Sequence, residues 1–501
     1  MVDTLPWPCP TEATEAPQRA GPARDYHFAM TRSERITIVG LVSFFAAAYI
    51  LYGLFRHWSF HSSYDMAILD QIVWHLARFE VPASSIKGLA NSFGDHFRPI
   101  VALFAPAYWL APGPESLIVL QGVLFAAAIP PMFVFLRRRL PVGPSVALCA
   151  AYGFFWGIQH AAAFEVHEVA FAPLIIAWAL LALDTQRWVG FWAAMLALML
   201  VKEDMIPVAG FFGLVLVIRG HWRQGSLLIA LSLLVFILVM RWLIPWLSGA
   251  SSPYMGLYTD LLQKPWLAPV ALVTPPGKLM AVLLWLAPFA FLSLASPLLI
   301  LAVPIALTLL LPTGAAYWGI SFHHAAPLAP ILALSAGDGL ARLVRHVRTP
   351  LARRRFLGWA AGVSVLLSAI LPGNQPFWDL FSFEHYRRHP DQHIWNEMAA
   401  LIPADASVVA QAALLPQLSH RQALYLLEEA DKDADFVAAT SRLGPWPAAG
   451  HEELAAWIDA RRRRDYQPIV EREGWILLRR IGAPANPPSQ QPGPQTTTRE
   501  P

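Results

Sequence analysis

The chain has 501 residues, of which 56% are hydrophobic and only 14% charged, with a formal net charge of +3. A water-soluble protein has roughly a quarter of its residues charged, so this composition excludes a chain that faces water on all sides. The small net charge gives no reason to expect nucleic-acid binding, and two cysteines, Cys9 and Cys149, cannot build a disulfide framework or a thiolate metal site.

Residues 1–35 hold no apolar core, so the sequence predicts a cytoplasmic tail without regular structure and no cleavable signal peptide. A membrane-spanning helix needs roughly 20 mostly apolar residues, and about eleven segments of the region 36–372 fit this requirement or come near it. The sequence therefore predicts an all-α polytopic membrane domain. The expected spans are 36–55, 117–136, 145–158, 170–183, 189–201, 206–218, 227–247, two within 279–312, 325–343 and 356–371.

Between the first two spans, residues 56–116 form a long loop in which we expect two helices at the membrane interface. In the first, residues 64–80, apolar side chains recur on one stripe at helical spacing. The second, residues 101–110, is apolar but too short to cross a membrane. The residues of the stripe are Leu69, Ile72, Val73, Leu76 and Phe79.

Arginines mark alternate ends of the predicted spans, which indicates the orientation of the chain because short cytoplasmic loops are enriched in Lys and Arg. With eleven spans, all of these arginines fall on one side, the N-terminus is cytoplasmic and everything after Leu371 is external. We therefore expect a multi-pass protein of the bacterial plasma membrane. The arginines are Arg32, Arg35, Arg137, Arg138, Arg139, Arg187, Arg219, Arg223, Arg342, Arg345, Arg348, Arg353, Arg354 and Arg355.

Residues 373–482 have the composition of an ordinary soluble protein and predict a small external α/β domain. Short strands are expected at 407–410, 423–427 and 435–439, a helix at 451–463, and two more strands within 469–478 that break at Glu473 and Gly474. The tail 483–501, rich in Pro, Gln and Thr, is expected to be disordered.

Five separate loops present charged or histidine side chains to the external side in this topology. Ionisable groups at membrane depth are costly and therefore functional candidates, although a polar cluster can also simply solvate its turn. For Glu165 and Glu168 both interpretations stay open. Asp65 and Asp70 lie five residues apart, roughly 140° around a helix, so we expect only one of them to face the centre. The remaining candidates are Asp95, His96, Arg98, His167, Lys202, Glu203, Asp204, His323 and His324.

At these residues the sequence resembles a bacterial membrane-protein family called domain of unknown function 2079 (DUF2079), over roughly residues 36–480. The resemblance is carried by several motifs in order. They are YDMAILDQIVWHLARF, GDHFRPIVALFAPAYWL, FEVHEVAFAPLIIAWALLAL, LVKED, HHAAPLAPILAL and SVVAQAALLPQLSHRQALYLL.

A wider resemblance is to the C-type (GT-C) membrane glycosyltransferases, which place an acid at the start of a surface helix in the first external loop. Asp65 matches that acid, His96 with Pro99 matches the start of the second surface helix, and Lys202 matches the lysine of an external tight turn. Two departures are the absence of an adjacent acidic pair, since Met66 follows Asp65, and HFRP in place of a His-Lys-Pro-Pro motif.

This resemblance implies a polyprenyl-phosphate sugar donor and a glycan, lipid or protein acceptor of the cell envelope. It implies Asp65 as general base, with Asp70 as the second carboxylate of the same helix, and Lys202 and Arg98 as partners of the lipid phosphate. His96, His167, His323 or His324 would orient phosphate or acceptor, together with Glu203 and Asp204.

Asp65, Asp95, His96, Glu203 and Asp204 are ligand types that also suit a divalent metal, but the sequence has no recognised metal-ligand spacing. Two other classes stay open: a membrane transporter, and a non-catalytic membrane protein of cell-envelope assembly. A transporter would carry polar or broken helices near the middle of the membrane, whereas here the charges gather at one face.

Overall fold

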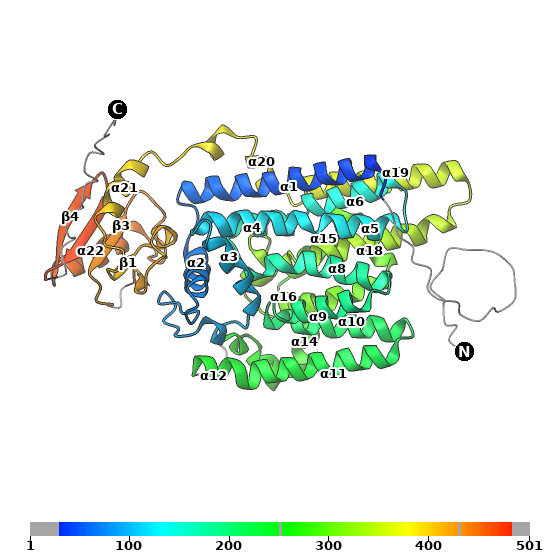
Figure 1. Ribbon diagram of the computed structural model, residues 1–501, viewed down its shortest axis with the longest axis horizontal. Helices are drawn as coiled ribbons and strands as arrows, with labels where there is room; N and C mark the ends of the chain where they lie inside the picture. The colour runs from blue at the N-terminus through cyan, green and yellow to red at the C-terminus, as the bar shows by residue number, and fades with distance from the viewer. Residues whose placement is uncertain (1–29, 250–252, 429–431, 483–501) are drawn as a thin grey trace, which may run out of the picture.

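The computed structural model describes residues 30–249, 253–428 and 432–482. The tail predicted at 483–501 and residues 1–29 of the tail predicted at 1–35 lie outside the described residues, whereas residues 32–35 already belong to the first helix. The chain forms a bundle of roughly parallel and antiparallel helices with a small α/β domain at one end (Figure 1). The bundle helices are α1 (Arg32–Trp58), α4 (Pro114–Ala127), α5 (Ile129–Arg137), α6 (Val142–Phe154), α7 (Trp156–Phe164), α8 (Phe171–Asp184), α9 (Trp188–Met199), α10 (Ile206–Ile218), α11 (Trp222–Leu238), α12 (Ile244–Ser248), α15 (Gly277–Leu286), α16 (Val303–Leu310), α18 (Leu328–Leu343) and α19 (Pro350–Ile370).

Within the described ranges, five helical stretches are long and apolar enough to cross a membrane: Arg32–Trp58, Pro114–Arg137, Val142–Phe164, Trp222–Ser248 and His323–His346. Shorter apolar helices accompany them at Pro99–Tyr108, Trp188–Met199, Gly277–Phe289 and Pro297–Leu310. The expected mostly helical, apolar architecture is therefore present. Helix length and composition do not by themselves confirm the number of eleven spans.

The region 279–312 differs from the expected pair of regular spans. After α15 the chain passes through three short 3-10 helices, η8 (Ala287–Phe289), η9 (Leu292–Ala295) and η10 (Pro297–Ala302), before α16. Between η8 and η9, Ala290 and Phe291 adopt left-handed backbone angles, with φ of 50° and 58°. Pro288 and Pro297, which lack a backbone N–H, stand at the starts of two of these segments and explain why a continuous α-helix does not form.

In the loop of residues 56–116, the helix α2 (Tyr64–Ala77) lies within the first expected helix. Nine of its residues are buried, including the polar Asp70, Gln71 and His75, so burial extends beyond the predicted apolar stripe. Phe79 lies beyond the helix end and is 86% exposed. The second expected helix is a 3-10 helix, η2 (Pro99–Phe104), followed by a single turn, α3 (Ala105–Tyr108), which packs against α2.

The C-terminal domain closely follows the predicted strands and helix. Its five-stranded sheet has the order β2-β1-β3-β5-β4, with β1 parallel to β2 and β3, and β5 antiparallel to β3 and β4. The strands are β1 (Val408–Ala410), β2 (Leu424–Leu426), β3 (Phe436–Thr440), β4 (Tyr466–Arg472) and β5 (Trp475–Arg480), and the helices are α21 (Gln392–Ala400) and α22 (His451–Arg462).

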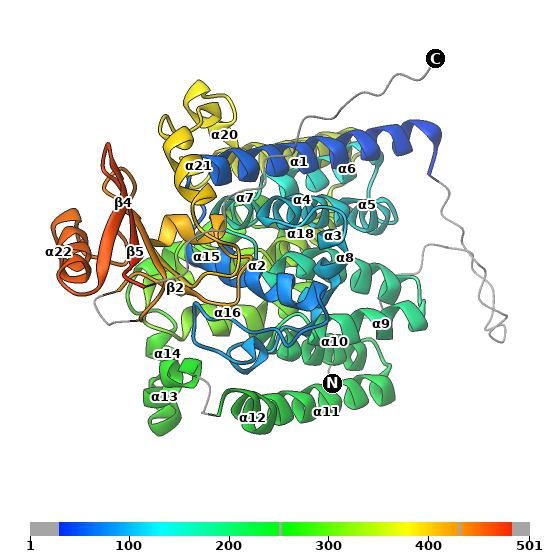
Figure 2. The same cartoon turned by 60° about the vertical axis from the view of Figure 1, so that its left-hand side comes forward.

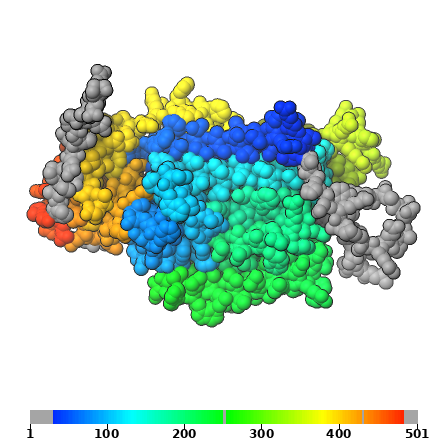
Figure 3. All heavy atoms as spheres, in the orientation of Figure 1, coloured from blue at the N-terminus to red at the C-terminus, as the bar shows by residue number. Residues whose placement is uncertain are grey.

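This domain covers the end of the bundle where α1 ends and α2 begins (Figures 1 and 2). Its segment η14 (Ala412–Gln417) packs on α2, so α2 is enclosed between the bundle and the domain. The connections α5–α6 and α18–α19 lie at the opposite end and, with the helix turns beside them, carry nine of the fourteen arginines that mark the predicted cytoplasmic side (Figure 1). In the space-filling view the domain and the first loop share one end of the molecule (Figure 3).

Candidate functional site

At the end of the bundle below the C-terminal domain, a buried carboxylate joins two cations from different loops. Glu168, in the short connection η3 (Glu168–Ala170) that follows α7, has a 1% exposed side chain. Its Oε2 atom lies 3.2 Å from Arg98 Nη1, and its Oε1 atom lies 3.2 Å from Lys202 Nζ. Three loops more than 30 residues apart in sequence therefore meet at one carboxylate.

The charges of this triad explain its electrostatics. Burial acts to raise the pKa of Glu168, but the cations Lys202 and Arg98 outweigh it and hold the pKa well below its ordinary value. Burial likewise acts to lower the pKa of Lys202, but the carboxylates of Glu168, Asp204 and Glu203 outweigh burial and raise this pKa above its ordinary value. Glu168 and Lys202 are thus both charged at neutral pH. With the guanidinium of Arg98, the triad holds more cations than anions.

Lys202 opens the turn η4 (Glu203–Met205) between α9 and α10, which brings two further acids to the site. Glu203 Oε1 lies 2.6 Å from His96 Nδ1, and Glu203 Oε2 accepts a hydrogen bond from the Phe97 backbone N–H at 2.9 Å. Burial is the main reason that the pKa of Glu203 and that of Asp204 each rise to about 7. The short contact between its carboxyl group and His96 allows Glu203 to fix the ring of His96 in place.

Asp65, the second residue of α2, faces this group from the first loop. Its Oδ2 atom lies 3.7 Å from His167 Nε2, and its side chain is 41% exposed while that of His167 is 10% exposed. Burial acts to raise the pKa of Asp65, but the nearby imidazole of His167 and the charges of Lys87 and Arg98 lower it below its ordinary value. Asp65 is therefore an ionised carboxylate that solvent still reaches beside largely buried neighbours.

The histidines of the site are stacked. The rings of His167 and His323 have centroids 3.5 Å apart, and His324 stacks on Tyr317 at 5.6 Å. Neither ring nitrogen of His323 has a hydrogen-bond partner in the part of the chain that the structure describes. A buried imidazole without a partner has hydrogen-bonding capacity left for a bound molecule.

Two residues of this region, Lys87 and Tyr254, escaped the sequence analysis as site residues, and for a third, Glu168, a functional role and a solvated turn stayed open. Glu168 is the acid that organises the cations, Lys87 Nζ lies 2.6 Å from Asp95 Oδ2, and the ring of Tyr254 stacks on His96 at 4.2 Å. Their roles depend on partners distant in sequence. The only signal available beforehand was that Glu168 and Tyr254 fall in loops on the same predicted side as the other candidates.

Asp70 is not part of this group. Its side chain is completely buried, accepts hydrogen bonds from the hydroxyls of Tyr108 and Ser419, and lies 3.0 Å from His420 Nε2. It therefore ties α2 to the C-terminal domain, on a different face of the helix from Asp65, as the 140° estimate anticipates. Within the described residues no group of three or more His, Cys, Asp or Glu side chains is arranged to hold a metal ion.

A family model described as a predicted membrane protein, DUF2079, matches residues 56–477 of the chain. The fold is similar to that of ArnT from Cupriavidus metallidurans, in a crystal structure bound to undecaprenyl phosphate and in another in the apo state. Each comparison gives a TM-score of 0.53 at 13% sequence identity and covers 90% of this chain and 99% of ArnT. No curated protein shows significant similarity to the chain.

Proposed function

The chain belongs to the DUF2079 family of predicted membrane proteins, and from this premise we propose that it is a GT-C-type glycosyltransferase that uses a polyprenyl-phosphate sugar donor. The observation that carries the proposal is the triad in which Arg98 and Lys202 flank Glu168, beside the accessible carboxylate of Asp65. The excess of cations can bind a phosphate, and the carboxylate beside them can take a proton from an acceptor, so together they suit the transfer of a sugar from a lipid phosphate. The shared fold with ArnT, whose crystal structure holds undecaprenyl phosphate, supports the donor class.

Asp65 is the general base in this proposal. As an acceptor hydroxyl attacks C1 of the sugar, its proton passes to the Asp65 carboxylate, the new O–C1 bond forms, and the bond from C1 to the phosphate oxygen breaks. The lowered pKa keeps Asp65 ionised at neutral pH, and its exposure leaves room for an acceptor. The contact with His167 holds the carboxylate in one orientation.

Lys202 and Arg98 bind the lipid phosphate and stabilise the charge that develops as it leaves. Glu168 holds the two cations side by side before the donor arrives, so that little reorganisation is needed on binding. Glu203 and Asp204 carry only part of a negative charge at neutral pH, because the pKa of each is about 7, and they do not fully cancel the cations.

The remaining residues shape the pocket for sugar and acceptor. His96 is held by Glu203. His323 stacks on His167 and adds two imidazole nitrogen atoms that have no partner within the described residues, and His324 lies against His323. The external domain, residues 373–482, would then select the acceptor, a cell-envelope glycan, lipid or protein, because it covers the same end of the bundle as Asp65 (Figure 2). A divalent metal stays a candidate component that activity measurements with chelator would test.

The proposed topology has eleven spans in a bacterial plasma membrane, a cytoplasmic N-terminus and an external C-terminal domain. It is supported by the arginine-bearing connections α5–α6 and α18–α19, which lie at the end opposite the domain (Figure 1). Reporter fusions after Arg139, Arg355 and Arg480 test it. A cytoplasmic signal from the last fusion contradicts the arrangement.

The function is tested with purified protein in liposomes. Transfer of labelled sugar from a polyprenyl-phosphate sugar to an acceptor extract, lost in Asp65→Asn, is the expected result. Uptake of solute into the liposomes without any transfer would favour a transporter, and the absence of both would favour a non-catalytic envelope protein.

A further inference from the structure

The first turn of α2, which carries Asp65, is not capped by the side chain of the residue that precedes the helix. A helix leaves its first backbone N–H groups without partners inside the helix, and the residue before the first turn commonly satisfies one with its side chain. Ser63 stands at that position, yet its side chain makes no capping hydrogen bond. An acceptor for these amides must therefore come from elsewhere.

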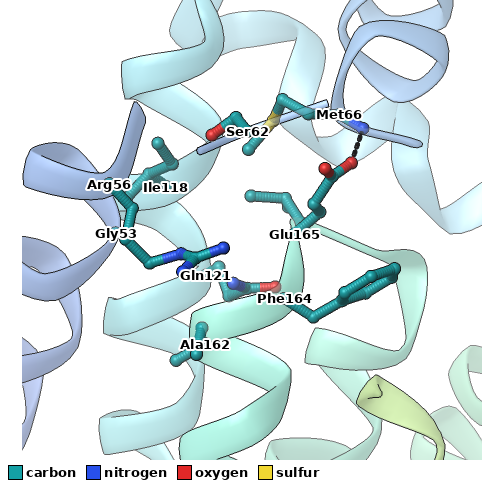
Figure 4. A pocket seen from close by; sticks show the side chains of 11 residues that line it. Gly53, Arg56, Ser62, Met66, Ile118, Gln121, Ala162, Phe164 and Glu165 are labelled. Carbon is teal, nitrogen blue, oxygen red and sulfur yellow. Dashed lines mark hydrogen bonds between the residues drawn. The ribbon is translucent and has the colours of Figure 1, made fainter. Parts of the chain in front are cut away.

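Glu165, from the loop after α7, supplies it. Its Oε1 atom accepts a hydrogen bond from the Ser63 backbone N–H at 2.6 Å, and its Oε2 atom accepts one from the Met66 N–H. Figure 4 shows the carboxyl group pointing at the start of α2, with the bond to Met66 drawn. The two amides are those that a capping box satisfies within one helix, but here a single carboxyl from a different segment serves both.

The burial of this carboxyl has a cost that the two hydrogen bonds offset only in part. Glu165 is 6% exposed, and burial, with a smaller contribution from the charge of Asp65, raises its pKa to about 8, while the amides of Met66 and Ser63 act to lower it. A carboxyl group whose only role was to solvate its turn would lie at the surface. Its position indicates a role in holding α2.

We propose that Glu165 is the positioning residue of Asp65, because it clamps the first turn of α2 to the same loop that carries His167. Asp65 lies between the two clamped amides, and His167, its contact, is two residues from Glu165. One short loop thus sets both the backbone of the base and the ring that orients it. This inference rests on the proposed function, in which Asp65 takes the proton from the acceptor.

The test compares Glu165→Gln with a double variant that restores a cap from within the helix. Glutamine has the same size but one acceptor oxygen, so at least one of the two amides loses its partner. In Glu165→Gln/Ser63→Asp, the new aspartate can accept from the Met66 N–H, as aspartate does at this position in many helices. Glu115→Gln is the matched control, since Glu115 lies in the first turn of α4 and accepts a hydrogen bond from Trp58 instead of from α2.

Hydrogen exchange of a peptide covering residues 60–68 and the rate of sugar transfer are the two readouts. We expect Glu165→Gln to speed exchange about tenfold or more and to lower turnover by a similar factor, with KM for the donor unchanged. In the double variant, exchange should become slower and turnover faster than in Glu165→Gln. Glu115→Gln should change neither the exchange rate nor the turnover.

Exchange that stays at the wild-type rate in Glu165→Gln overturns the clamp, whatever the enzyme does. Faster exchange with unchanged turnover overturns the link to Asp65. Faster exchange in a protein whose wild type transfers no sugar supports the clamp and counts against the proposed function alone, so the two failures are distinguishable.

Discussion

The Nε2 atom of His167 lies 3.7 Å from the Oδ2 atom of Asp65, although helices α3 to α7 lie between the two residues in the sequence. The contact places a carboxylate from α2 against the loop that also carries Glu168 and, through it, the two cations. The proposed base and the proposed phosphate partners are therefore linked through one loop.

The first prediction concerns this carboxylate. Asp65→Asn keeps the size and hydrogen bonding of the side chain but removes its basicity, so sugar transfer should fall about 100-fold or more. Binding of the polyprenyl-phosphate donor should be retained, because its phosphate contacts other residues. Glu384→Gln, which alters an exposed surface ion pair with Arg387, is the control and should keep wild-type transfer. Full activity in Asp65→Asn would remove Asp65 from the chemistry.

Lys202→Met should weaken binding of a polyprenyl phosphate about 10- to 100-fold, the range for a lost hydrogen bond to a charged group. It should also lower thermal stability, because Glu168 keeps only Arg98 as a partner. The double variant Lys202→Met/Glu168→Gln removes both charges and should recover stability but not lipid binding. Recovery of lipid binding in the double variant would show that Lys202 acts only as the partner of Glu168.

Asp70→Asn should loosen the C-terminal domain and leave the chemical step largely intact. The change weakens the hydrogen bonds from Tyr108 and Ser419 and the contact with His420, and a disturbed buried polar group costs about 1–3 kcal/mol. Limited proteolysis between α20 (Pro376–Asp379) and α21 should become faster. If Asp70→Asn abolishes transfer while proteolysis is unchanged, Asp70 has a direct catalytic part that its burial does not suggest.

The stability contributed by Glu168 should depend on pH in a defined direction. Its pKa is held well below the ordinary value of 4.5, so it stabilises the folded state above that pH, and this contribution is lost as the pH falls through 4.5 toward the folded-state value. The difference in melting temperature between wild type and Glu168→Gln should therefore be largest at neutral pH and shrink in acid. A difference that grows as the pH falls contradicts the ion-pair assignment.

Much of the fold follows from local sequence pattern. The strands of the C-terminal domain were predicted to within a few residues, since each is a short apolar run between turn residues, and β4 and β5 meet at Glu473 and Gly474 as expected. The 3-10 segments after α15 were missed, because apolar composition alone does not distinguish them from a continuous helix.

The sequence predicts the candidate residues of the site better than the contacts between them. Asp65, Lys202 and His323 were found because polar residues beside apolar spans stand out in any membrane sequence. The positions of Glu168 between two cations and of Glu165 at the start of α2 depend on packing of distant segments, which no local pattern encodes. The different faces of Asp65 and Asp70 were foreseeable because helix geometry alone separates them.

A structure of the protein with a bound polyprenyl phosphate tests the central claim most directly. The account predicts that a phosphate oxygen lies about 3 Å from Lys202 Nζ or the Arg98 guanidinium, with the bonded sugar position facing Asp65. A phosphate bound at the opposite end of the bundle, near the α18–α19 connection, or no binding to the wild-type protein at all, would contradict it.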